Sequence, residues 1–337
     1  MRRLFVIGGM VVCAAMAAQA QVKSGHVPPD ATAVAHVDLK ELNASPMGAF
    51  IRQSLDDNAR RGLTWLQSMA GINLTNDVDS IVAYATGKLQ MTGVVQVAYG
   101  RFDVAKLTAV AGGAKEFQNK ALGERSLLSW TEGRKRRHLC FIDPTMVLLT
   151  WDEAHLLEAV VRFDRTDGAT EGEGPFEQVL SRKKGRFFAA QVTDVAGLAD
   201  ANPKLQMFRQ AEAALLEISQ MEESNGVSCV LAVKAPSKEL AMQLSQAAQG
   251  VQALFLLQAA QNPEAAEVAQ GVKVELKEDL VTVTLKLKEE SLRKMVQVRL
   301  EQRKAADAAR RAARKAAREP ADDGAAEAEK KPERPAF

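Results

Sequence analysis

The sequence predicts an α+β protein, and three observations lead to that class. Apolar and polar residues alternate along residues 272–287, as expected for two strands with one buried face. The turn Asn225-Gly226 precedes a β-branched run at residues 227–233, which is typical of a hairpin. Ser237 then stands where a helix cap belongs, ahead of a long segment of helix-forming residues. Strands and helices therefore alternate along the chain.

The first residues predict export. Arg2 and Arg3 precede an apolar run at residues 4–17, which ends in Ala18-Gln19-Ala20. This basic start, apolar middle and small-residue end are the pattern of a secretory signal peptide. We expect a signal peptide over residues 1–20, cleaved after Ala20, and a secreted or periplasmic mature chain. A linker is expected over residues 21–31.

The first predicted half covers residues 32–165. Its helix starts can be recognised in the sequence. Ser45-Pro46 and Asp103 suit helix starts, and Thr150-x-x-Glu153 suits a capping box. The elements expected in order are a strand at 32–39, a helix from Ser45-Pro46, paired strands at 80–85 and 94–99, a helix after Asp103, a hairpin at 126–142, a strand at 146–150 and a helix from Glu153.

The second predicted half covers residues 175–300, after a polar, glycine-rich boundary at residues 165–174. Residues 215–221 are compatible with either helix or strand. The other elements expected in order are a short helix at 176–180, a strand at 187–192, a helix at 203–211, a strand at 227–233, a long helix from Ser237 to about residue 261 and the hairpin at 272–287.

The two halves share a rough order of strand, helix, hairpin and helix, which indicates an internal duplication. We expect two similar halves, each a mostly antiparallel sheet with helices packed on one face. The order loosely follows the ferredoxin-like β-α-β-β-α-β pattern. A basic, alanine-rich C-terminal helix is expected over residues 301–319 and a disordered tail over residues 320–337.

The composition suits a globular chain with a real core, at 47% hydrophobic and 26% charged residues. No segment after the signal peptide reaches about eighteen uncharged apolar residues, so the mature chain is predicted to lack a membrane span. Cys13 leaves with the signal peptide. Cys140 and Cys229 could form a bridge that joins the halves, but their spacing matches no motif and favours two unpaired thiols.

The charge is unevenly distributed. The net charge of +2 falls to about zero once Arg2 and Arg3 are removed, while residues 299–318 are strongly basic. We expect two anion-binding candidates. The alternative for the hairpin tip is a solvated turn, and the alternative for the tail is a solvated, partly disordered segment. The tip comprises Arg134, Lys135, Arg136 and Arg137, and the tail comprises Arg310, Arg311, Arg314, Lys315 and Arg318. The expected partner is an anionic envelope polymer or lipid headgroups, without specific nucleic-acid binding.

No motif for catalysis, nucleotide binding or metal binding is present. The patterns G-x-S-x-G, G-x-G-x-x-G and the EF-hand loop are absent, so no cofactor or metal is expected. His36 and Asp38 point the same way on one strand, but a structural hydrogen bond is the simpler role for them. The alternative is a hydrolase-like envelope enzyme that assembles His36, Asp38 and His138 into one site.

Several short motifs carry a family resemblance. They are Pro29-Asp30-Ala31, Val37-Asp38-Leu39, Ser45-Pro46-Met47-Gly48, Gly71-Ile72-Asn73, Asp77-Val78-Asp79-Ser80, Gly100-Arg101-Phe102-Asp103 and Asp152-Glu153. In these the chain resembles a loose group of uncharacterised secreted bacterial proteins with a signal peptide and a duplicated α+β body. The resemblance implies a compartment and a fold type, and it transfers no catalytic residue.

These observations favour an extracytoplasmic, non-enzymatic binding or structural protein of the cell envelope. The basic C-terminal helix is expected to tether it to an anionic surface. A purely structural, oligomeric role is a third reading, for which an exposed apolar sheet face would be the sign.

Overall fold

A computed structural model describes residues 22, 24–55, 60–61, 63–64, 67–68, 71–87, 93–165, 176–222, 224–259 and 263–316. The chain divides into two compact units, residues 1–289 and 290–337. Three predicted segments lie outside the described residues: the signal peptide at 1–20, nearly all of the boundary at 165–174, and the tail at 320–337.

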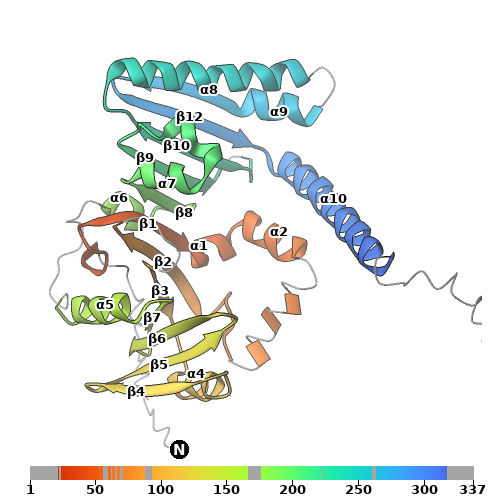
Figure 1. The fold of residues 1–337 in the computed structure, drawn as a ribbon. Helices are drawn as coiled ribbons and strands as arrows, with labels where there is room; N and C mark the ends of the chain where they lie inside the picture. Colours follow the sequence, from red (N-terminus) through yellow and green to blue (C-terminus); the bar gives the residue numbers. More distant parts are fainter. Residues whose placement is uncertain are drawn as a thin grey trace, which may run out of the picture. The chain divides into compact units, whose positions relative to one another are not determined.

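The first unit contains one antiparallel sheet of twelve strands in the order β11-β12-β10-β9-β8-β1-β2-β3-β7-β6-β5-β4 (Figure 1). The strands are β1 (Ala31–Asp38), β2 (Val78–Thr86), β3 (Val94–Gly100), β4 (Gln118–Leu122), β5 (Arg125–Glu132), β6 (Lys135–Asp143), β7 (Met146–Thr150), β8 (Arg186–Val192), β9 (Ala213–Gln220), β10 (Val227–Lys234), β11 (Val272–Lys277) and β12 (Leu280–Leu287).

The helices lie between these strands in the sequence. Those of the first unit are η1 (Ser24–His26), α1 (Leu39–Ala44), α2 (Pro46–Ser54), α4 (Val104–Gly112), α5 (Glu153–Arg165), α6 (Glu177–Leu180), α7 (Val195–Ala201), η4 (Pro203–Phe208), α8 (Lys238–Ala259) and α9 (Pro263–Gly271). The described part of the second unit is formed by α10 (Glu289–Ala316).

The predicted α+β class is confirmed, but the predicted sheet arrangement needs two corrections. First, the strands form one sheet, because β1 of the first half pairs antiparallel with β8 of the second, for example at Ala35 and Ala190. Second, the arrangement is not ferredoxin-like. Strands joined through a helix, such as β1 and β2, are direct antiparallel neighbours, whereas a split βαβ unit joins parallel strands.

Helices cover both faces of the first half, which corrects the prediction of helices on one face. Val147 and Leu148 are consecutive in β7 and therefore point to opposite faces. Leu148 packs in the cluster that contains Leu156 of α5, and Val147 packs in the cluster that contains Leu107 of α4. Strands β5 to β7 are apolar on both sides, so both faces need cover from water.

The helix caps follow the sequence at two positions and differ at a third. Ser45 Oγ accepts the Gly48 N–H at 3.1 Å, and Asp103 Oδ1 accepts the Lys106 N–H at 2.9 Å, as predicted. The predicted capping box at Thr150 is wrong, because α5 is capped by Asp152. Its Oδ1 accepts the N–H groups of Ala154 and His155. Asp152 directly precedes the first turn, where a cap side chain can reach those groups.

Other local predictions were incomplete. Strand β4 was not predicted, because its sequence QNKAL is polar and mostly exposed at the edge of the sheet. The helix expected at residues 203–211 is the shorter η4, and α7 precedes it. The ambiguous residues 215–221 fall mostly within β9, which pairs with both β8 and β10.

The described residues of the segment 21–31, which was expected to be a linker, pack onto the core. Val27 is buried, and the His26 ring stacks on Phe163 at 4.2 Å between centroids. His26 Nδ1 also lies 2.8 Å from the Tyr99 hydroxyl. His26 therefore anchors the N-terminal segment to α5 and β3.

Both cysteines outside the signal peptide are free thiols. Cys140 lies in β6 and Cys229 in β10, seven strand positions apart in the sheet, which at about 4.8 Å each is about 34 Å. This separation rules out a bridge between them within one chain. Burial raises the pKa of the Cys140 thiol to about 11, so it remains protonated and unreactive at neutral pH.

Candidate functional site

The candidate site begins with the way α8 is placed on the sheet. Ser237 Oγ accepts the Leu240 N–H at 3.2 Å and so caps the helix where the sequence predicted. From there α8 runs beside α9 and over strands β11 and β12 (Figure 1). Its buried residues are only Ala241, Leu244 and Ser245, all near its first turns. The later turns of α8 therefore leave the sheet beneath them incompletely covered.

An apolar cavity of about 270 Å³ lies where that cover is incomplete. Its floor is the face of the sheet on which the predicted hairpin buries its valines. Its lining residues are Met207 and Phe208 of η4, Leu244, Ala248, Val251, Gln252 and Phe255 of α8, and Leu231, Val233, Val272, Val281 and Val283 of the sheet. None of these side chains is charged, and eleven of the twelve are hydrocarbon, aromatic or thioether groups.

The one polar lining residue, Gln252, has its amide nitrogen engaged by the protein. Gln252 Nε2 donates to the carbonyl oxygens of Val272 at 2.9 Å and Ala269 at 3.3 Å. These bonds join α8 to the end of α9 and the start of β11. The amide thus holds one end of the cavity together, and the rest of the lining offers a ligand hydrophobic contact.

Such a cavity has a defined chemistry. Protein interiors rarely leave voids larger than a water molecule, because every lost contact costs dispersion energy. This apolar pocket is partly open to solvent, but its lining gives water few hydrogen-bond partners and favours an apolar occupant. The described lining holds no acid, base or nucleophile, and it offers a ligand hydrophobic contact.

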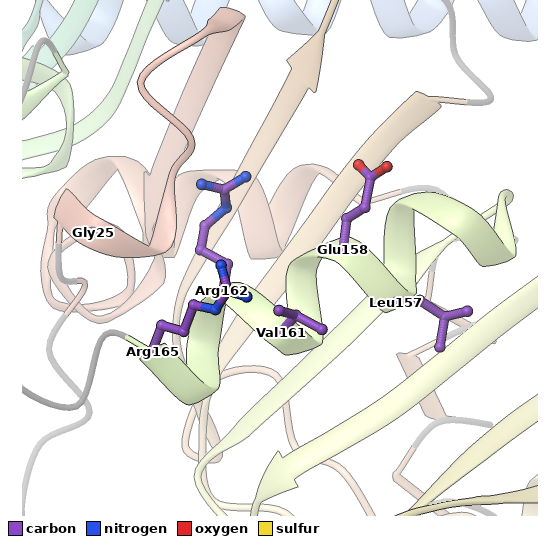
Figure 2. A pocket seen from close by; sticks show the side chains of 6 residues that line it. All are labelled: Gly25, Leu157, Glu158, Val161, Arg162 and Arg165. Carbon is purple, nitrogen blue, oxygen red and sulfur yellow. The ribbon is translucent and has the colours of Figure 1, made fainter.

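A larger hollow of about 580 Å³ lies beside α5 and is the weaker candidate. Figure 2 shows its lining, in which Glu158 and Arg162 extend together while Leu157 projects elsewhere. Arg162 interacts with Tyr84, whose pKa burial raises to about 12. These side chains leave the outer flank of α5, so they do not converge on a single enclosed ligand.

The basic tip predicted to bind anions is largely occupied by its own protein. Arg136 donates to Ser129 Oγ at 3.0 and 3.2 Å. The Arg137 guanidinium lies 3.6 Å from the centroid of the Trp151 ring, in a cation–π contact. Arg134 and Lys135 are exposed at the turn. Arg136 and Arg137 thus have partners within the protein, and Lys135 Nζ lies 6.0 Å from the centroid of the Trp151 ring. Anion binding at the tip stays a prediction.

The structure describes only some of the tail cations that were predicted to bind anions. Arg310 is exposed on α10, and the backbone of Arg311, Arg314 and Lys315 is helical. Arg318 lies outside the described residues. The helix begins at Glu289, twelve residues ahead of the predicted start at 301, because the apolar stripe from Leu292 to Leu300 is already helical.

The residues of the enzymatic alternative are not brought together. His36 is buried, with Nδ1 3.2 Å from the Val179 carbonyl oxygen, and desolvation lowers its pKa. Asp38 caps α1 through the Glu41 N–H and pairs with Arg182. His138 lies on β6, four strand positions from β1, or about 19 Å away. Within the part of the chain that the structure describes, no cluster of His, Cys, Asp and Glu could hold a metal ion.

Sequence reasoning missed the cavity, although one signal for it was present. Residues 240–263 contain no Asp, Glu, Lys or Arg, and the run from Val251 to Leu257 is apolar at six of seven positions. A helix that covers a sheet with one face needs apolar residues on that face alone. The excess of apolar residues in this run indicated a second use for the helix.

Comparisons with known proteins give the following result. No family model and no curated protein matches the chain. Crystal form III of TP0453, a Treponema pallidum protein, is similar at 9% identity and a TM-score of 0.47, over 81% of this chain and 96% of that one. Crystal form I of TP0453 gives 9% identity and a TM-score of 0.42, over 82% and 98%. A likeness at this level supports no inference about function.

Proposed function

We propose that this protein is an extracytoplasmic, non-enzymatic binding protein of the cell envelope that holds an apolar ligand between α8 and the sheet. The cavity carries this proposal, because it is lined almost entirely by hydrocarbon side chains and no charge lines it. An apolar molecule would gain contacts there that the protein alone leaves unmade. A flexible hydrocarbon chain, as in a fatty acid, fits such a lining best.

The export part of the proposal rests on the sequence of residues 1–20, with cleavage expected after Ala20. A hydrophobic ligand suits that location, since lipids and their breakdown products are plentiful in an envelope. The described residues contain no helix long and apolar enough to cross a membrane. The non-enzymatic part is supported by the distance of about 19 Å between the strands that carry His36 and His138.

We also propose that the two halves, residues 32–165 and 175–300, are related by an internal duplication. In its support, β1-β2-β3-β7 and β8-β9-β10-β12 are two runs of neighbouring strands with helices at equivalent connections. α1 and α2 follow β1 as α7 follows β8, and α4 follows β3 as α8 follows β10. The two runs meet where β1 pairs antiparallel with β8. In this proposal α8 is the second-half counterpart of α4, enlarged to enclose a ligand.

The proposed tether is α10, whose exposed positions include Arg310. Its sequence from residue 301 onward is alanine among charged residues, with cations in excess. Such a helix attracts anionic polymers or headgroups by charge alone, so its binding would fall steeply as salt rises.

The test uses residues 21–337, which include every described element, and cis-parinaric acid, a fatty acid that fluoresces when buried. Saturable binding of one equivalent is expected. Ala248→Phe places a ring in the cavity and should weaken binding at least tenfold. Ala247→Phe makes the same change at an exposed neighbouring position of α8 and should leave binding unchanged. Unsaturable binding, or equal binding by both variants, would contradict the proposal.

A further inference from the structure

The second half of α8 exposes large apolar side chains to solvent. Five of them, here named the apolar end of α8, have exposed fractions between 36% and 76%. They are Val251 (47%), Leu254 (59%), Phe255 (36%), Leu256 (52%) and Leu257 (76%). Isolated exposed apolar residues are normal on protein surfaces, but a contiguous group at one place marks an interaction site.

The arrangement of these residues around the helix limits what can cover them. Successive residues of an α-helix are about 100° apart, so Leu254 to Leu257 point to all sides of α8. A folded protein partner, or a second copy of this chain, would dock against one side and leave the others in water. A fluid hydrocarbon phase surrounds a helix end on every exposed side. The geometry therefore suits lipid acyl chains better than a protein surface.

The charge pattern points the same way. Residues 240–263 lack Asp, Glu, Lys and Arg, so the entry of this helix end into an apolar layer desolvates no charge of its own. Its polar side chains are glutamines such as Gln258, which can remain at headgroup level. Because no cation takes part, attraction to anionic headgroups is not needed. In this respect the apolar end differs from α10, whose cations need anionic headgroups to bind a membrane.

The apolar end also adjoins the cavity. Val251 and Phe255 belong both to the exposed group and to the cavity lining. A hydrocarbon chain could pass from a lipid layer to the cavity along side chains that are apolar throughout. Figure 1 shows that this part of α8 lies beside α9, so the helix is held against the body while its end remains accessible.

We infer that the apolar end of α8 inserts into the interfacial region of a lipid bilayer. The helix lies at the surface and does not span the bilayer, because the described part of the chain contains no helix suited to span one. Binding is hydrophobic, so it is expected on electrically neutral lipid and should withstand high salt. The inference goes beyond the proposed ligand site and does not depend on the cavity being occupied.

The test is flotation of residues 21–337 with phosphatidylcholine vesicles, in about 0.1 M and about 1 M salt. The wild-type protein should float at both salt concentrations. Leu254→Gln with Leu257→Gln should reduce the partition coefficient by at least roughly tenfold, since two exposed leucines lose their hydrocarbon contact. Met242→Gln is the control, as Met242 is 49% exposed on the same helix but outside the apolar end.

Three outcomes would overturn the inference. The first is failure of the wild-type protein to float with phosphatidylcholine, and the second is a double variant that floats as well as the wild type. The third is flotation that requires phosphatidylglycerol and disappears with salt or with truncation after Leu300, which would assign binding to α10. Circular dichroism should show an unchanged fold, since both leucines are exposed. Fatty-acid binding without vesicles is measured separately, so failure of one proposal is distinguishable from failure of the other.

Discussion

Two helices that cover the same sheet, α5 in the first half and α8 in the second, differ in what they put against it. α5 directs Leu156, Ala159, Val160 and Phe163 into the core, and Leu156 is fully buried. The sheet-facing stripe of α8 mixes small or polar residues such as Ala241, Ser245 and Ala248 with larger ones, Leu244, Val251 and Phe255, which border the cavity without filling it. Other large residues, such as Leu254 and Leu257, are exposed.

The strands beneath the two helices reflect this difference. Val97 and Leu148 under α5 are fully buried, whereas Leu231 and Val283 under α8 remain partly exposed. Small residues on one helix therefore leave unfilled the volume that large residues fill on the other. The comparison shows that a helix can be rich in apolar residues and still leave a cavity. Packing depends on the size of the side chains on the face that meets the sheet.

Truncation of a core leucine gives the largest expected difference between the halves. Leu156→Ala should lower the free energy of unfolding by about 3 to 5 kcal/mol, because it opens a void in a closed core. Leu244→Ala on α8 should cost about 2 kcal/mol or less, because Leu244 already borders a cavity. Urea unfolding of both variants gives the comparison. Equal losses would mean that α8 is packed as tightly as α5.

Enlargement of a helix alanine should act with opposite signs in the two halves. Ala159→Phe in α5 should destabilise by about 1 to 3 kcal/mol through overpacking, since Ala159 is 2% exposed. Ala248→Phe should raise stability by about 0.5 to 2 kcal/mol through filling of the cavity. Thermal unfolding without ligand measures both. Destabilisation by Ala248→Phe would indicate that the space closes in solution.

Acid sensitivity gives the smallest expected difference. Three of the four histidines, at 36, 138 and 155, lie in the first half, His26 lies in the segment that precedes it, and the second half has none. Desolvation lowers the pKa of His36 and of His138 below 6.5 in the folded protein. The unfolded chain thus binds more protons below pH 6.5, and the stability from these neutral histidines is lost as pH falls through their lowered folded pKa values.

Hydrogen exchange between pH 7 and pH 5 checks this prediction. Amides of β1, β2 and β6 should lose protection before those of β10 and β12. His36→Gln should flatten the pH dependence in β1 and its neighbours. Simultaneous loss in both halves would show that the sheet unfolds as one cooperative unit, with no acid-sensitive part.

Much of the local structure could be predicted because short-range chemistry determines it. Alternation placed β11 and β12, Asn225-Gly226 placed the turn before β10, and Ser45, Asp103 and Ser237 marked helix starts. The predictions that failed relied on local sequence signals that a neighbouring residue or a neighbouring strand overrode. Asp152 outcompeted Thr150 as the cap of α5, and the polar strand β4 forms because β5 offers it an edge.

The candidate site was less predictable than the fold. The basic tip was visible as four consecutive cations, but the positions of Trp151 and Ser129 beside them were not. His36 and Asp38 were interpreted from the sequence as a structural pair, but their partners, Val179 and Arg182, could not be predicted because they come from distant parts of the chain. The cavity corresponds to no sequence motif, because it is a space left between elements that lie far apart in the sequence.

The sequence by itself determined the α+β class, most strand positions, several helix caps and the uncharged run at residues 240–263, since each depends on neighbours within a few residues. The tertiary structure alone decided that β1 and β8 join twelve strands into one sheet, that helices cover both faces of the first half, and that α8 encloses a cavity. These features depend on pairing and packing between distant segments, which local propensity does not encode.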